Sequence, residues 1–296
     1  MSDAPGEPTL LWRHQPGWPR RLEDLAHPPA ALHVQGAVLP REAAIAIVGS
    51  RRATLPGREI AFDLARHLAR RGVQVVSGMA RGIDAAAHRG ALAGGGSTVA
   101  VLGCGLDVCY PPEHLGLRGE IVECGCLVSE YPAGTAPRRG RFPTRNRIIA
   151  ALVLGVVVVE AAERSGALST ARNGVDLGRE VFAVPGSIRS ERSRGSNALI
   201  RDGAVPLLEP DDVLTHLPAL RGLAPPDPGG WTAPAPPGLP PLLAGVLEHI
   251  GHDPVHPDAL GMELGLEAAV VGARLTALEV AGRIRTVSGG LVLRTF

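Results

Sequence analysis

The stretch of the chain best suited to bind a ligand is RRGRFPTRNRII, at residues 138–149. It holds five arginines between Arg138 and Arg147, and its Phe142 is one of four phenylalanines in the chain. Guanidinium groups bind phosphate and aromatic rings stack on bases, and together they hold single-stranded nucleic acid. The alternative is a solvated basic loop with Phe142 packed into the core. We favour the binding interpretation, with these candidate residues: Arg139, Phe142, Arg145, Asn146 and Arg147.

A helix is expected over residues 144–154, with Thr144 as its N-cap. Arg145, Asn146 and Arg147 would then lie in the first helical turn. Cations there oppose the helix dipole, and a bound anion would remove that cost. Such a local conflict is typical of a functional site.

Small residues and hydroxyl residues follow several of the predicted strands. Backbone N–H groups and guanidinium groups at the start of a helix form an anion site. A plain strand–helix turn would also use glycine and serine, so a single such turn says little. Several on one sheet edge predict a phosphate-lined cleft. The candidates are Gly49, Ser50, Arg51 and Arg52 after the first strand, Ser77 and Gly78 after the second, and Ser165, Gly166 and Ser169 after the apolar run at 155–161.

These turns depend on an alternation of apolar runs and helical patterns between residues 45 and 217. Continuous apolar strands separated by helices predict a parallel sheet covered on both faces. Right-handed crossovers make the domain a doubly wound, mostly parallel, Rossmann-like α/β fold, with ligands beyond the carboxyl ends of the strands. The strands are expected at 45–49, 73–78, 97–103, 126–130, 155–161 and 180–186, and the helices at 57–72, 82–95, 144–154 and 166–178.

Three further segments flank this domain in a chain of 296 residues. Residues 1–44 are expected to be a lead-in segment with one short helix and one edge strand. Residues 218–241 contain nine prolines and predict a semi-extended linker. Residues 242–296 predict three helices and a hairpin, the pattern of a small winged-helix domain. Its last helix carries few cations, so protein contacts are at least as favoured as DNA reading.

Composition excludes several classes of protein. The chain has no lysine, which excludes P-loop nucleotidases and Schiff-base enzymes. Its net charge is +1, so any basic site must be local. The first strand lacks the GxGxxG fingerprint of dinucleotide enzymes. The four cysteines form no CxxC pair and are interpreted as small buried residues. We find neither a signal pattern nor a run of membrane-spanning length, so a cytoplasmic protein is expected.

Catalysis at the same sheet edge is the competing interpretation. The candidate residues are Glu160, Ser165, Asp84, His88 and Asp107. They form no Ser-His-Asp spacing and no GxSxG elbow. Glu160 could equally cap a helix or hold an arginine. We therefore predict a protein that is not an enzyme and needs no cofactor, with a nucleotide or nucleoside-phosphate hydrolase as the alternative.

Six motifs, occurring in order, resemble the DNA-processing protein A family, also called DprA or Smf. They are IAIVGSRRAT, SGMARGIDAAAHRGAL, VLGCGLDVCYP, FPTRNRIIA, SGALSTARNGVDLGREVFAVPGS and GSNALIRDGA. The resemblance covers about residues 8–217. It implies a homodimeric extended Rossmann domain that binds single-stranded DNA with little dependence on sequence. It also implies loading of the RecA recombinase and displacement of single-strand-binding protein during natural transformation, without catalytic activity.

The resemblance also assigns residues. It makes Gly49, Ser50 and Arg51 a phosphate-binding turn, and it makes 142–147 the family's FPxRNR motif with Arg139 as the upstream cation. SGALSTA departs from the commoner SGSLITA and places a second hydroxyl, Ser169, near the cleft. Nucleotide-cleaving proteins of related fold carry PGGxGTxxE, where this chain reads PGSIRSERSRGSN. Many relatives carry an N-terminal helical domain whose pattern is not found in this sequence; either this member lacks that domain or the sequence begins after it.

Overall fold

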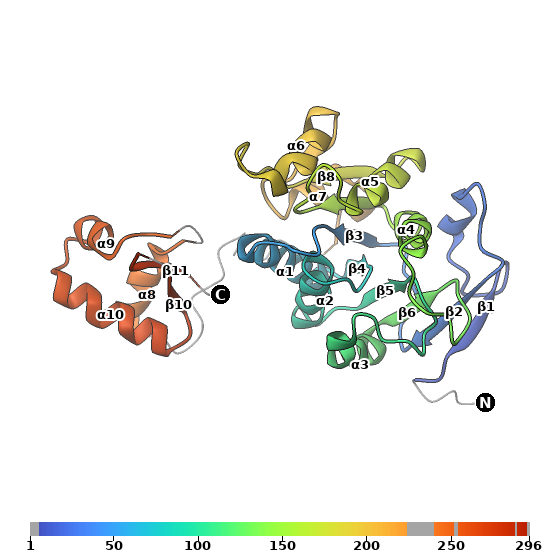
Figure 1. The fold of residues 1–296 in the computed structure, drawn as a ribbon, viewed down its shortest axis with the longest axis horizontal. Helices are drawn as coiled ribbons and strands as arrows, with labels where there is room; N and C mark the ends of the chain where they lie inside the picture. Colours follow the sequence, from blue (N-terminus) through green and yellow to red (C-terminus); the bar gives the residue numbers. More distant parts are fainter. Residues whose placement is uncertain (1–5, 224–239, 252–253, 288, 295–296) are drawn as a thin grey trace. The chain divides into compact units, whose positions relative to one another are not determined.

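The computed structural model describes residues 6–223, 240–251, 254–287 and 289–294 (Figure 1). The chain divides into two compact units, Met1–Trp231 and Thr232–Phe296. Separate clusters of buried apolar side chains stabilise the two units.

A single large sheet forms the centre of the first unit. Its described strands follow the order β1-β2-β6-β5-β4-β3-β7-β8-β9. Neighbours from β6 to β9 in this order are parallel, whereas β1 and β2 add antiparallel strands at one edge. The strands are β1 (Thr9–Trp12), β2 (Ala31–Gly36), β3 (Ala44–Val48), β4 (Gln74–Ser77), β5 (Thr98–Leu102), β6 (Cys126–Ser129), β7 (Gly155–Val158), β8 (Glu180–Ala183) and β9 (Val205–Pro206).

Helices cover both faces of this sheet because successive strand side chains point to opposite sides. On β3, Ile45 and Ile47 pack toward α1 and α2, whereas Ala46 and Val48 pack toward α4 and α5. This arrangement confirms the predicted doubly wound fold. The helices are α1 (Leu55–Arg70), α2 (Ile83–Ala93), α3 (Leu115–Cys124), α4 (Arg141–Ala151), α5 (Ala167–Asp176), α6 (Arg194–Arg201) and α7 (Asp212–His216), with short 3-10 turns η1 (Arg20–Asp24), η2 (Pro112–His114), η3 (Glu191–Ser193) and η4 (Pro218–Leu220).

The strand order reverses beside β3, which has β4 on one side and β7 on the other. The helix after β3 covers one face of the sheet and the helix after β7 covers the opposite face. The two connections therefore leave in opposite directions and open a crevice beyond the carboxyl ends of the two strands.

The N-terminal residues differ from the expectation of one edge strand. They supply two strands, β1 and β2, with η1 between them. Strand β2 pairs with β6, so the residues predicted as a lead-in segment extend the sheet. Within the domain the observed strands end one to three residues before the expected ends, because the last residues turn toward the next helix.

The second unit consists of three helices and a hairpin, and it confirms the predicted winged helix. Its elements are α8 (Pro241–Glu248), α9 (Pro257–Leu264), α10 (Ala268–Val280), β10 (Ile284–Val287) and β11 (Leu291–Arg294). The predicted linker falls mainly in 224–239, outside the described residues. Among the described helices, none is both long enough and apolar enough to cross a bilayer.

Candidate functional site

A cleft of about 540 Å³ lies beyond the carboxyl ends of β3 and β7. Its walls come from residues 49–52 after β3, from 162–167 after β7, and from 139–146 at the start of α4. The cleft therefore occupies the point where the strand order reverses. Of the predicted site residues, those that line it are Gly49, Ser50, Arg51, Arg52, Arg139, Phe142, Arg145, Asn146, Ser165 and Gly166.

Four predicted residues lie elsewhere. Ser77 is fully buried and donates a hydrogen bond to the Ile47 carbonyl (2.7 Å). Gly78 lines an adjoining hollow instead. Ser169 does not line the cleft; it accepts a hydrogen bond from Asn146 Nδ2 (2.7 Å) and thereby joins α5 to α4. The fourth residue, Arg147, is described below.

The structure separates Arg147 from the cleft. Its Nη2 donates to both carboxylate oxygens of Glu130 (2.6 and 2.7 Å), and its Nη1 donates to the His27 carbonyl. This ion pair joins α4 to the segments that follow β6 and η1. In this geometry the Arg147 charge is balanced by an acid and does not face the cleft.

Helix α4 begins three residues before the expected start. Its N-cap is Gly140, and Pro143 lies in the first turn. A first-turn residue has no intrahelical use for its N–H, so proline is tolerated there. Thr144 is not a cap; its hydroxyl donates to the Gly140 carbonyl within the helix (3.2 Å). The expected dipole conflict at Arg145 is therefore wrong, because that residue lies in the second turn.

Arg145 extends beneath the cleft, and only 4 % of it is exposed. Its Nη1 donates to the carbonyls of Gly78 (2.8 Å) and Val101, at the ends of β4 and β5. A Cβ at position 78 would overlap the guanidinium, so glycine leaves the room that Arg145 occupies. Burial lowers the pKa of Arg145 to about 10, which still leaves it charged at neutral pH. Burial also raises the pKa of Asp84, and the nearby Arg145 charge offsets part of that rise.

The sequence left open whether Phe142 is a ring that stacks on a base or a residue of the core. In the structure its side chain is half-buried, between these two alternatives. Its ring stacks against Tyr110, with centroids 5.7 Å apart. The guanidinium carbon of Arg51 lies 4.7 Å from the ring centroid, a cation–π distance. Phe142 lines both the cleft and the adjoining hollow of about 260 Å³. One ring thus lies between two cavities that share Arg51.

Glu160, at the end of β7, holds the opposite turn in place. Its carboxylate accepts hydrogen bonds from the Thr54 hydroxyl (2.6 Å) and the Thr54 N–H (3.1 Å). Thr54 is in turn the N-cap of α1 and accepts from Gly57 N–H. The Glu160 carbonyl also accepts from Ser50 N–H (2.7 Å). Of the roles weighed for Glu160, the structure shows the capping role.

The other catalytic candidates have structural bonds. His88 is buried and accepts a hydrogen bond from Met79 N–H at Nε2, which leaves Nδ1 to donate to Thr98 Oγ1 (2.7 Å). Burial lowers the pKa of His88 to about 3, so the ring is neutral. The Asp107 carboxylate accepts from Gly134 N–H (2.9 Å). Within the described ranges, no cluster of three or more His, Cys, Asp or Glu residues could hold a metal ion.

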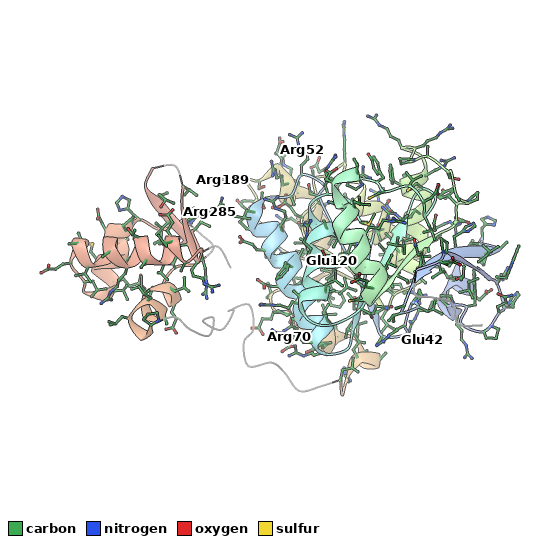
Figure 2. The ribbon with its side chains drawn as sticks, turned by 90° about the horizontal axis from the view of Figure 1, so that it is seen from below. Glu42, Arg52, Arg70, Glu120, Arg189 and Arg285 are labelled. Atoms are coloured by element: carbon green, nitrogen blue, oxygen red, sulfur yellow. The ribbon has the colours of Figure 1, made fainter. Side chains whose placement is uncertain are left out.

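Sequence reasoning missed several residues of the cleft. Arg164 and Thr170 line it, and Arg192 Nη1 donates to the Arg52 carbonyl (2.9 Å). Figure 2 shows Arg52 and Arg189 at one end of the first unit. Arginines 189, 192 and 194 follow β8. Ligands bind beyond the carboxyl ends of parallel strands, and this rule, which pointed to the turn after β3, could have found these arginines too.

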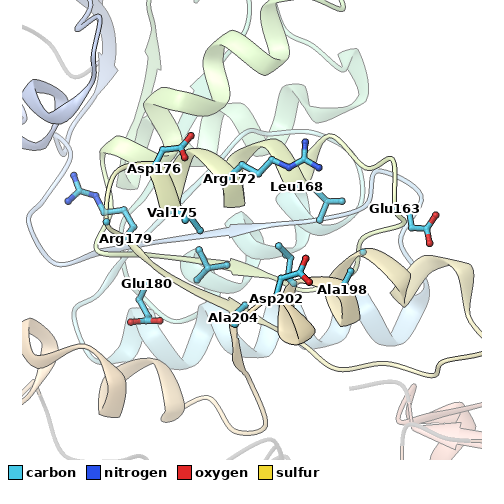
Figure 3. A pocket seen from close by; sticks show the side chains of 15 residues that line it. Glu163, Leu168, Arg172, Val175, Asp176, Arg179, Glu180, Ala198, Asp202 and Ala204 are labelled. Atoms are coloured by element: carbon cyan, nitrogen blue, oxygen red, sulfur yellow. The ribbon is translucent and has the colours of Figure 1, made fainter.

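A larger cavity, of about 680 Å³, lies between α5 and α6 (Figure 3). Acidic side chains outnumber the arginines around it. One of those arginines, Arg179, is paired with Asp24. This balance disfavours phosphate, so the smaller and more basic cleft is the better nucleic-acid candidate. The charged lining residues of the larger cavity are Glu163, Asp176, Glu180, Asp202, Arg172 and Arg179.

Comparison with known proteins agrees with the sequence motifs. A family model described as DNA recombination-mediator protein A matches residues 9–218, and one described as DprA winged helix domain matches 231–290. Protein Smf of Escherichia coli K12 is 37% identical over 299 residues, covering 97% of this chain and 80% of that protein. A putative DNA processing protein DprA of Mycobacterium tuberculosis is 45% identical over 222 residues, covering 73% of this chain but only 57% of that protein.

Two solved structures are similar over nearly three quarters of this chain. DNA processing protein A from Streptococcus pneumoniae has a TM-score of 0.68 at 38% identity, covering 71% of this chain and 75% of that chain. The protein from Helicobacter pylori has a TM-score of 0.65 at 30% identity, covering 72% of this chain and 96% of that chain. The latter structure was described for the single-stranded DNA binding mode of that protein.

Proposed function

The chain belongs to the DNA recombination-mediator protein A family, also called DprA or Smf, and on this premise we propose that its cleft binds single-stranded DNA. The observation that carries the proposal is the charge of the cleft. Arg51, Arg52, Arg139 and Arg164 line it, and none of them forms an ion pair with an acid among the residues that the structure describes. Unbalanced arginines in a chain of net charge +1 favour an anionic ligand at this place.

The form of the nucleic acid follows from Phe142. In a duplex the base faces are stacked on one another, so a half-buried aromatic ring in a cleft cannot reach them. The unstacked bases of a single strand can reach such a ring, and stacking there tolerates every base. Phosphate contacts carry no sequence information, so the arginines favour binding with little sequence dependence.

The proposal is tested by binding of fluorescent oligo-dT across a salt series, with a duplex as comparison. Arg51→Ala combined with Arg139→Ala should weaken binding to all sequences alike and flatten the salt dependence. Arg41→Ala combined with Arg172→Ala is the matched control, because these exposed arginines line neither the cleft nor its adjoining hollow. Equal loss in both variants, or none in either, would contradict the proposed site.

The role of the bound strand is proposed from family membership. The protein mediates recombination in natural transformation: it loads RecA on incoming single strands and displaces single-strand-binding protein. The assay is RecA filament formation on a strand pre-coated with single-strand-binding protein, with the wild type and the double arginine variant. Acceleration by both proteins alike would separate RecA loading from the cleft and oppose this role.

Two further properties belong to the same proposal. The protein acts as a homodimer, which sedimentation equilibrium tests; a monomer mass at every concentration would contradict it. It performs no chemical step on the nucleic acid, an expectation supported by the engagement of Glu160 with Thr54. Turnover of a mononucleotide panel that disappears in Glu160→Gln would favour the hydrolase alternative instead.

A further inference from the structure

A second basic hollow, of about 320 Å³, continues from the cleft across α1 and α2. We call it the α1–α2 groove; its lining includes Arg51, Arg52, Arg58, Arg81 and Arg89. Arg51 and Arg52 line the cleft as well, so the two hollows meet at the turn after β3. A ligand that leaves the cleft over this turn enters the groove directly.

The groove adds positive charge that the protein itself does not balance. Arg58 and Arg89 are exposed, and within the described ranges neither guanidinium forms a hydrogen bond or an ion pair with another residue. Arg81 is the exception, because it pairs with Glu113. Among the residues that the structure describes, no acidic side chain lines the groove. Two unpaired cations therefore continue the charge of Arg51 and Arg52.

The two helices hold these cations at a fixed separation. Gly90 of α2 lies so close to α1 that a Cβ there would overlap the Phe62 carbonyl oxygen. Arg58 on α1 and Arg89 on α2 therefore stand on a rigid pair of helices. Gly82, Ala85 and Ala86 line the groove with no more than a methyl group each, which leaves room for a chain of sugars and phosphates.

We propose that the α1–α2 groove binds the phosphodiester backbone of single-stranded DNA where the strand leaves the cleft. The inference rests on the proposed function, because the cleft supplies the first part of the path. The binding site is then longer than the cleft, and Arg58 and Arg89 bind phosphates that a short oligonucleotide does not reach.

The test compares two lengths of oligo-dT, of about six and about twenty nucleotides. In Arg58→Gln combined with Arg89→Gln, the slope of log K against log salt should fall by about 0.7 for each phosphate that is no longer neutralised, hence by about 1.4, on the long strand only. Affinity for the long strand should fall about three- to tenfold at moderate salt, as expected for solvent-exposed charge pairs. Binding of the short strand should be unchanged.

Arg41→Gln combined with Arg172→Gln serves as the control, because it removes the same charge from exposed positions that line neither hollow. An unchanged melting temperature in both double variants excludes a folding effect. If the groove variant binds the long strand with wild-type slope, or loses no more than the control, the groove inference fails while the cleft proposal stands. If the wild type binds neither strand, the proposed function itself fails.

Discussion

Arg145, which is buried near the buried Asp84, gives a prediction that separates a supporting role from a binding role. In Arg145→Met the Gly78 and Val101 carbonyls lose their side-chain donor, and Asp84 loses the nearby positive charge. Leaving a buried acceptor without its donor costs about 1–3 kcal/mol, hence about 2–6 kcal/mol for the two carbonyls. For a domain of this size, that lowers the melting temperature by about 4–24 °C.

The pH dependence of this loss identifies its origin. Burial raises the pKa of Asp84 above its ordinary 3.8, and without Arg145 that pKa rises further. A carboxyl with a raised folded-state pKa keeps its full stability below the unfolded pKa and loses stability as pH rises through the folded pKa. Because the folded-state pKa of Asp84 lies above 3.8 with or without Arg145, the deficit of Arg145→Met should be smallest at about pH 4 and below, and it should grow as pH rises through the folded-state pKa.

Adding Asp84→Asn to Arg145→Met should remove this pH dependence and restore part of the stability at the pH values where Asp84 would be ionised, because no uncompensated carboxylate then forms. The assay is urea denaturation followed by circular dichroism at several pH values, completed as a double-mutant cycle. Asn keeps an acceptor for the Ala80 N–H that Asp84 bonds. A double variant as unstable as the sum of its two single variants would refute the coupling between Arg145 and Asp84.

Three other predictions use residues at and behind the cleft. Arg139→Ala should lower the slope of log K against log salt for oligo-dT binding by about 0.7. Arg147→Ala should leave that slope unchanged, and the loss of its pair with Glu130 should cost up to about 1 kcal/mol of stability. Equal slopes for the two variants would contradict the placement of these arginines. Phe142→Ala should weaken binding by about 1–3 kcal/mol, with Phe142→Tyr close to wild type; isothermal calorimetry measures both, and equal affinity of the two variants would exclude stacking. His88 has a folded-state pKa of about 3 against an ordinary 6.5, so its contribution to stability should be lost as pH falls from 6.5 toward 3. The urea midpoint of His88→Gln should therefore change less over that range than the midpoint of the wild type. Parallel profiles of the two proteins would show that another group titrates.

The sheet and its crevice could be predicted because each central strand contains a short run of apolar residues. β3 is buried along its whole length, and so are β4 and β7, so composition alone marks them. The edge strands carry no such mark. β1 is largely exposed, and its pairing with β2 depends on a partner that local pattern does not reveal.

The candidate site was predictable as a region but not residue by residue. Arg145 and Arg147 are two positions apart, which on an α-helix rotates their side chains by about 200°. One therefore extends under the cleft while the other binds Glu130 on the far side of α4. Choosing between them requires the helix start, and Pro143 obscured that start because proline is accepted both before a helix and in its first turn.

The bonds from Glu160 to Ser50 and Thr54 join the segment just after β7 to the turn that follows β3. Two walls of the cleft are thereby held at a set width before any ligand arrives. A preorganised site has little ordering entropy left to lose on binding. Capture of a strand should then proceed at a rate set by electrostatic encounter, with a steep dependence on ionic strength and no slow isomerisation step.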